Sequence, residues 1–358
     1  MRAALLAAVL GALAHGAPAP ADELALAGID VYRSPRLTVE EATKRYGRRI
    51  NELVGLKGRR RGGAERAAEQ LRRRVEEEVR RDWGFAWVRL SWSDYYVDGA
   101  HKAFVTIDVV EPKDRAARMS FKPAPGRALG DPGGLLADWG RYSELGWKLL
   151  RKGEVASKHE TCLSLYCEWG AQTPELRAFE ERFVSQVQEH KQALLQVLRL
   201  ERDPAKRARA VLLLGYLQDG NESAKLIAEA LDDPAVEVRS AALRVYADYA
   251  VYHQDVFLPV TKIEAALDYP EAEDRSKAMA VVAGMASNRV HRRFLIMKMG
   301  AKILQLLESP HPATQDTAYA ALGILSKEAY DRRDVVSWKR WLERARAEEA
   351  ASESAGSE

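Results

Sequence analysis

The sequence has little of what a catalytic or metal-binding protein usually shows. It contains two cysteines and seven histidines in 358 residues. It has no Gly-rich phosphate loop, no Gly-x-Ser-x-Gly elbow and no His-Glu-x-x-His zinc helix. Positive charge is not in excess either, since 55 Lys and Arg against 52 Asp and Glu leave a formal net charge of +3. A dedicated nucleic-acid binder is usually more basic. We therefore predict no enzyme, no cofactor, no metal and no nucleic-acid partner.

Long apolar runs are absent except at the start of the chain. Arg2 precedes an apolar stretch from Ala3 to Ala14, and Ala19-Pro20-Ala21 offers small residues for cleavage. This order is typical of a secretory signal peptide. A membrane anchor is the alternative, but the stretch is shorter than the roughly 20 residues that span a bilayer, and no Cys follows it to carry a lipid. We predict a signal peptide at 1–21 and a periplasmic or secreted mature chain.

The hydrophobic period changes in a definite order after the signal peptide. Apolar residues suit strands in 24–32, 85–96 and 103–110, and Asp98-Gly99 is a typical hairpin turn. Between the first two strands, Thr38 and Glu41 form a capping box, and apolar residues at three- and four-residue steps predict two helices separated by a glycine-containing break. The predicted order is β-α-α-β-β.

This order, and the acidic end Val109-Val110-Glu111, resemble a POTRA domain, the module found in front of outer-membrane barrels and in some division proteins. The resemblance covers residues 22–118. It implies a small sheet with two helices on one face, and an exposed strand edge that accepts a segment of another protein. No barrel-like series of strands follows, which argues against a role in assembling membrane proteins.

Positive charge concentrates where the first predicted helix ends, at Lys57, Arg59, Arg60 and Arg61. Glutamates lie at helical spacing among the arginines that follow, so we favour a solvated surface held by i,i+4 ion pairs. The alternative is a dock for anionic lipid or another polyanion, which predicts steep salt dependence. A peripheral membrane contact through these residues is therefore not the favoured expectation.

Proline and glycine are frequent in 119–134, where we predict a linker at which the two halves of the chain hinge. The next segment, 135–174, is predicted to be helical at first, with Trp139 and Trp147 packed in the core.

Both cysteines, Cys162 and Cys167, lie in that segment. In an exported protein two nearby cysteines most often form a disulfide. A five-residue step in a regular helix separates the side chains too far for that bond, so a disulfide predicts a bent loop. Independent thiols, a metal site or a redox centre remain alternatives. A zinc site would need two more ligands, and His159 is the only histidine near in sequence; redox centres usually have the closer Cys-x-x-Cys spacing.

One pattern of Leu, acid, any residue and Pro recurs in the second half, at Leu231–Pro234, Leu267–Pro270 and Leu307–Pro310, with a looser copy at Leu200–Pro204. Each copy follows an apolar helix face and precedes a helix rich in small residues. The prolines lie about 30, 36 and 40 residues apart, which is the range of helical-pair repeats.

The copy at Leu231–Pro234 resembles a HEAT repeat, because Asp233, Pro234, Val238 and Arg239 stand where that family has its inter-helix turn signature. The copies at Leu267–Pro270 and Leu307–Pro310 lack the Val-Arg pair. The resemblance implies stacked helix pairs over 175–346, with an extended concave surface that holds proteins or peptides. The polar tail, 347–358, is predicted to be disordered.

The sequence thus predicts an α+β domain followed by an all-α helical-repeat solenoid. The leading hypothesis is an exported, non-enzymatic scaffold that binds other envelope proteins through the concave repeat surface. The alternative is a thiol-redox or metal-binding protein centred on Cys162 and Cys167. A third hypothesis, by analogy with HEAT-like proteins that act on bilin chromophores, rests on the fold alone.

Overall fold

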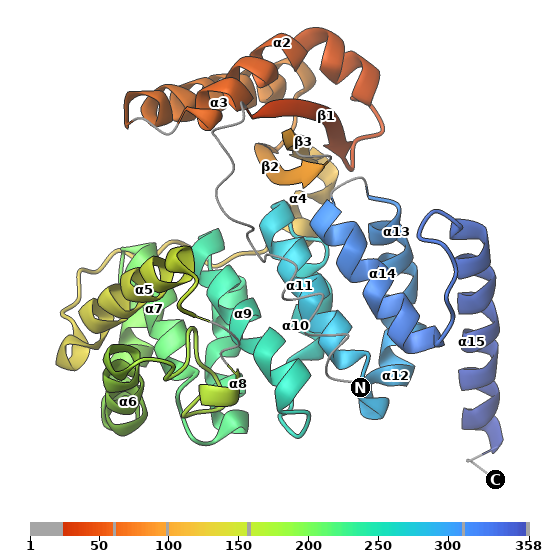
Figure 1. Cartoon of the computed structure of the whole chain (residues 1–358). Helices are drawn as coiled ribbons and strands as arrows, with labels where there is room; N and C mark the ends of the chain where they lie inside the picture. The colour runs from red at the N-terminus through yellow and green to blue at the C-terminus, as the bar shows by residue number, and fades with distance from the viewer. Residues whose placement is uncertain (1–23, 60–61, 98–99, 156–158, 310–311, 356–358) are drawn as a thin grey trace. The chain divides into compact units, whose positions relative to one another are not determined.

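The computed structural model describes residues 24–59, 62–97, 100–155, 159–309 and 312–355 (Figure 1). The predicted signal peptide lies outside these ranges. The chain divides into two compact units, each built from separate stretches of sequence. Unit 1 contains the N-terminal part up to residue 120 together with 268–276 and the chain from 298 onward; unit 2 contains 121–267 and 277–297. Within the described ranges, no helix has both the length and the apolar character needed to cross a membrane.

Unit 1 contains a three-stranded sheet made of β1 (Ala25–Tyr32), β2 (Trp87–Val97) and β3 (Ala100–Val110). The strand order is β1-β3-β2, with β1 parallel and β2 antiparallel to the central β3. Parallel strands need a crossover connection, which the two helices between β1 and β2 supply. The observed element order is the predicted β-α-α-β-β.

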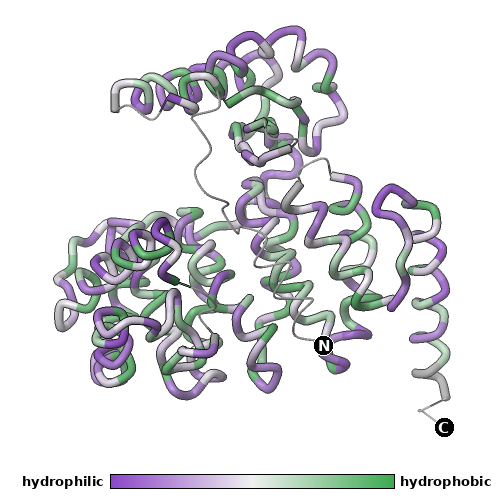
Figure 2. The backbone as a smooth tube through the Cα atoms, in the orientation of Figure 1, coloured by the Kyte–Doolittle hydropathy of each residue, from purple (hydrophilic) through white to green (hydrophobic). Residues whose placement is uncertain are grey.

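The helices α2 (Val39–Gly58) and α3 (Gly62–Trp83) bury their apolar faces in one core with β2 and β3. Thr38 begins α2 as predicted, because its side chain accepts a hydrogen bond of 3.2 Å from the Glu41 N–H. Figure 2 shows hydrophilic and hydrophobic residues alternating along both helices, whereas β1 is largely hydrophobic. Burial of one face of each helix therefore stabilises this layer.

The remaining helices of unit 1 are α4 (Arg115–Arg118), the first residues of α11 (Ala272–Met285), α13 (Gly300–Leu307), α14 (Pro312–Ser326) and α15 (Val335–Ala355). The helix α13 packs against both α14 and α15. Trp338 of α15 is fully buried. We expected the chain to lose order after residue 346, but α15 continues to Ala355 because its alanines and glutamates are strong helix formers.

Unit 2 is helical, with α5 (Leu135–Lys152), α6 (Pro174–Leu200), α7 (Pro204–Leu214), α8 (Gly220–Ile227), α9 (Val236–Tyr252), α10 (Val260–Ala266), most of α11, and α12 (Arg289–Phe294). Short 3₁₀ helices are Pro112–Asp114 in unit 1 and Pro132–Gly134, His159–Thr161 and Ala228–Asp232 in unit 2. A π-helix, Leu295–Met299, follows α12. In unit 2, α7 packs between α6 and α9, and α5 contacts both α6 and α7.

Trp139 lies in the core as predicted. The prediction for Trp147 is wrong: the residue is 48% exposed, although its ring makes a T-shaped contact with the Trp169 ring.

The Pro/Gly-rich segment expected to be a hinge is bonded along its length to helix-connecting turns of unit 2. The Lys122 N–H donates to the Asp232 carbonyl over 2.8 Å. Arg127 donates to the Leu200 carbonyl over 3.1 Å and accepts from the Arg202 N–H over 2.6 Å. These bonds hold residues 122–127 as an extended strap, so the chain between 121 and 127 belongs to unit 2.

Candidate functional site

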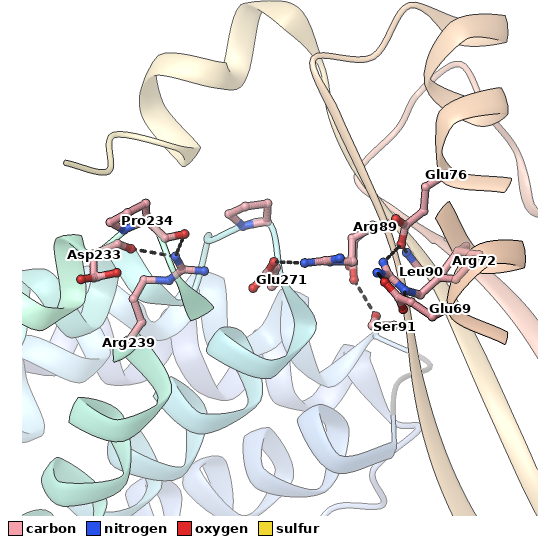
Figure 3. Close-up of polar contacts among 12 residues, drawn as sticks. Glu69, Arg72, Glu76, Arg89, Leu90, Ser91, Asp233, Pro234, Arg239 and Glu271 are labelled. Atoms are coloured by element: carbon pink, nitrogen blue, oxygen red, sulfur yellow. Dashed lines mark hydrogen bonds and ion pairs between the residues drawn. The ribbon is translucent and has the colours of Figure 1, made fainter. Parts of the chain in front are cut away.

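Three buried arginines occupy equivalent positions at successive inter-helix turns. Arg207, Arg239 and Arg275 are 2%, 1% and 3% exposed. Each donates from Nη1 to the carbonyls six and five residues earlier, over distances of 2.6 to 3.1 Å. Figure 3 shows these bonds for Arg239. A guanidinium satisfies carbonyls that a sharp turn leaves unpaired inside the protein, so these side chains hold the turns closed.

The sequence predicted only Arg239 of this series. The Val-Arg pair of the HEAT signature does not identify Arg207 or Arg275, because Lys206 and Asp274 precede them. The common signal is an arginine six residues after the second or third residue of the Leu-acid pattern, at Glu201, Asp233 and Tyr269.

In unit 2 the arginines also bind groups from other segments. Arg207 forms two hydrogen bonds of 2.8 Å to the two carboxylate oxygens of Asp233. Asp233 also accepts the Ala235 N–H over 2.8 Å, so it binds both the preceding turn and the backbone of the residue directly before α9. Arg239 stacks on the Phe121 ring, 4.1 Å from its centroid.

In unit 1 the buried arginine, Arg275, binds the sheet instead of a carboxylate from another turn. Arg275 donates to Asp108 of β3 over 2.5 Å and lies 3.7 Å from the centroid of the Tyr32 ring. Asp108 is fully buried and also accepts from the Ser91 hydroxyl over 2.6 Å. This carboxylate lies on the sheet face opposite α2 and α3, so residues 268–276 cover that second face.

The four predicted signature residues are therefore structural. Val238 and Arg239 are buried, Pro234 is half-buried, and Asp233 is 5% exposed with its carboxylate engaged. They fix the turn that precedes α9.

The two cysteines lie in a bent loop, as their spacing predicted for a bonded pair. The Cα atoms of Cys162 and Cys167 are 5.7 Å apart, which is disulfide distance. Cys167 is fully buried. The loop is anchored by Trp169, whose backbone N–H donates to the Tyr142 hydroxyl over 2.7 Å. In the part of the chain that the structure describes, no group of three or more His, Cys, Asp or Glu side chains is arranged to hold a metal ion.

The structure describes two of the four basic residues predicted as a possible polyanion site at the end of α2. Lys57 lies over the Trp92 ring, 4.3 Å from its centroid, and Arg59 is exposed. Arg60 and Arg61 lie outside the described residues. Further along, the α3 arginines pair with glutamates three and four residues away, as in Arg72 with Glu69 and Glu76, and Arg80 with Glu77.

One of the sheet edges expected to accept a partner strand is partly occupied by a side chain. The Leu90 N–H of edge strand β2 donates to Glu76 Oε1 over 2.8 Å (Figure 3). Arg72 donates to the same carboxylate over 2.5 Å. Burial raises the pKa of Glu76, whereas the Arg72 guanidinium lowers the pKa of the more exposed Glu69 to about 2. A strand added along β2 would have to displace Glu76 at this position.

Unit 2 also has a small cavity of about 220 Å³ beside the strap, lined by residues that include Lys122, Pro123, Arg199 and Glu229. Glu229 pairs with Arg199 over 2.7 Å and with Lys122 over 3.7 Å. These charges neutralise one another, so the cavity offers no evident reactive group.

Comparison with known proteins does not extend this description, because no protein-family model, no curated protein and no solved structure matches the chain.

Proposed function

We propose that this chain is an exported scaffold that binds other envelope proteins and catalyses no reaction. The observation that carries the proposal is the series Arg207, Arg239 and Arg275, a buried guanidinium at each of three helix-connecting turns. Arg239 follows Arg207 by 32 residues and Arg275 follows Arg239 by 36. Repeats of this length that are closed in the same way build an extended binding surface from many helices.

The finer fold assignments belong to the same proposal. A HEAT-like array is supported by Asp233 and Arg239, which fill the turn positions that the family's signature implies. A POTRA-like domain is supported by the β1-β3-β2 order and by two helices on one sheet face.

Export is supported by two separate features. Cys162 and Cys167 lie at disulfide distance, which suits an oxidising compartment. Residues 1–21 have the charge and apolar pattern of a secretory signal. The partners are then proteins of the same compartment.

The binding surface is tested by photo-crosslinking in the native cell. Ala205 of α7 and Glu237 of α9 are exposed and each precedes its buried arginine by two residues, so they are equivalent positions on the second helices of two pairs. Gln188 of α6 and Lys225 of α8 are exposed on the first helices. A photo-reactive amino acid is placed at each position in turn.

We expect one partner to crosslink from both Ala205 and Glu237 and from neither Gln188 nor Lys225. Such a result places one protein along successive repeats. If none of the four positions captures a protein, the scaffold function is wrong.

A further inference from the structure

One short motif of the sequence has no part in the proposed function. The chain contains three asparagines, Asn51, Asn221 and Asn288, and Asn221 alone is followed two residues later by Ser or Thr, in Asn221-Glu222-Ser223. Asn-x-Ser, with x other than Pro, is the acceptor sequence for N-linked glycosylation of exported chains. A motif this short also arises by chance, so its structural setting decides whether a glycan fits.

The Asn221 side chain is exposed on unit 2, in the first turn of α8. Its Oδ1 accepts the Phe257 N–H over 2.8 Å, and this bond identifies which amide atom is the oxygen. The other amide atom, Nδ2, has no hydrogen-bond partner among the residues that the structure describes. Nδ2 is the atom to which an N-linked glycan is attached, so the attachment point is available.

The start of α8 does not depend on that nitrogen. Asp219 Oδ1 accepts the Asn221 and Glu222 N–H groups over 2.9 and 3.1 Å and so caps the helix. The bond to Phe257 uses Asn221 Oδ1, which an N-linked sugar leaves unchanged. A glycan on Nδ2 is therefore compatible with the three bonds that hold this turn.

Phe257 gives a second and independent observation. The residue is 80% exposed, although its neighbours Val256 and Leu258 are 5% and 9% exposed. Because the Phe257 N–H is bonded to Asn221, the first sugar on Nδ2 starts beside this residue. The C–H groups of a sugar ring carry partial positive charge and pack on the negative face of an aromatic ring. A sugar on Asn221 would thus cover an aromatic side chain that the fold leaves in water.

We propose that Asn221 is an N-glycosylation site and that the first sugar of the glycan packs on Phe257. The donor is an oligosaccharide linked through pyrophosphate to a lipid of the export compartment. The bond between sugar C1 and the pyrophosphate oxygen breaks, the bond between C1 and Asn221 Nδ2 forms, and one amide proton leaves with the lipid pyrophosphate. The site rests on the export that the proposed function includes, and it adds a carbohydrate to the protein partners.

Attachment of the glycan has to precede the folding of α8. A transferase that recognises Asn-x-Ser must reach both side chains, and Ser223 is fully buried. The Ser223 hydroxyl donates to the Leu214 carbonyl over 2.9 Å and accepts from the Tyr249 hydroxyl over 2.8 Å. The glycan is therefore added to the newly exported chain, before Ser223 is enclosed.

The test is the mass of the tryptic peptide 210–225, which contains Asn221 and no other asparagine. The full chain, with its own N-terminal segment, is expressed in its native cell and recovered from the envelope and the medium. We expect a mass increase equal to a whole number of sugar residues, located on Asn221 by fragmentation. Asn221→Gln and Ser223→Ala should abolish the increase, and Ser223→Thr should keep it, because Ser and Thr both complete the motif.

Asn288→Gln is the matched control. Asn288 also bonds a neighbouring turn, through its donation to the Gln254 carbonyl, but it lies outside the motif. This variant should keep the full mass increase on Asn221. The mass of a peptide does not depend on whether a variant folds, so a destabilised variant still gives a result.

The packing of the sugar on Phe257 is tested by thermal melts of the glycosylated chain and of the Asn221→Gln chain. Phe257→Ser should lower the melting temperature of the first by about 2–4 °C and that of the second by about 1 °C or less. Equal shifts in the two chains would overturn the packing.

The outcomes separate this site from the proposed function. An exported chain with an unmodified peptide 210–225 would overturn the site and leave the scaffold unaffected. A chain that stays in the cytoplasm would overturn both the site and the export. A mass increase that survives Asn221→Gln would assign the sugar to another residue. A glycan on Asn221 in a chain whose photo-crosslinkers capture no protein would establish the site and contradict the scaffold.

Discussion

The guanidinium of Arg207 binds both carboxylate oxygens of Asp233 over 2.8 Å, and both residues are at least 95% buried. The pair links the turn before α7 to the turn before α9, since Asp233 also accepts the Ala235 N–H. A buried charge that loses its partner costs several kcal/mol, so each member of the pair needs the other.

Removing one member of this pair should destabilise unit 2 strongly. Arg207→Met leaves the Asp233 charge buried without its partner, and we expect the free energy of unfolding to fall by about 3–5 kcal/mol. Denaturant unfolding followed by circular dichroism measures the change. The control is Arg177→Met, because Arg177 is 52% exposed and 3.9 Å from Glu181. Its loss should change stability by about 0–1 kcal/mol. Equal effects of the two substitutions would contradict the buried-pair argument.

Gly146 of α5 lies against the Trp169 ring, and a Cβ atom there would overlap that ring. We expect Gly146→Ala to lower the melting temperature, through a loss of about 1–3 kcal/mol that outweighs the better helix propensity of alanine. Gly55 of α2 is the matched control, since a Cβ there meets no atom within 4 Å. Gly55→Ala should stabilise by about 0.5–1 kcal/mol. A stabilising effect at Gly146 would show that the loop with the cysteines moves away from α5 at little cost.

The contribution of Glu69 to stability should depend on pH. The Arg72 hydrogen bond holds the pKa of Glu69 at about 2 in the folded chain, against an ordinary value of 4.5. The folded state therefore favours the ionised form, and the resulting stabilisation is complete above pH 4.5 and is lost as pH falls toward 2. Because Glu69 is partly exposed, we expect Glu69→Gln to cost about 1 kcal/mol or less at neutral pH. Thermal melts of both proteins across the acid range should converge near pH 2; a difference that persists there would contradict the argument.

The cysteine pair should matter for stability alone. Closing so short a loop stabilises by about 2 kcal/mol in the chain-entropy model, so we expect Cys162→Ser/Cys167→Ser to lose about that much free energy of unfolding. Crosslinking from Ala205 and Glu237 should persist below the lowered melting temperature. If the folded double variant loses all partner capture, the thiol-centred alternative gains over the scaffold.

The sequence by itself determined the features that depend on neighbours within a few turns of chain. Thr38 and Glu41 define the start of α2 through a local capping bond, and alternation of apolar residues is enough to order β1, α2, α3, β2 and β3. Arg239 was singled out by the resemblance to a HEAT turn, and its guanidinium bonds to the carbonyls of Asp233 and Pro234, six and five residues earlier.

Only the tertiary structure decided the features that depend on distant segments. The partners of Arg207 and Arg275 are Asp233 and Asp108, far along the chain, and no local pattern specifies them. The expected linker is a bonded strap because the carbonyls of Leu200 and Asp232 happen to face it. Asn288 ties the start of α12 to the turn after α9, because its side-chain amide donates to the Gln254 carbonyl. Local patterns set the helices and strands, whereas long-range packing determines which charges are buried together and which apolar side chains remain exposed.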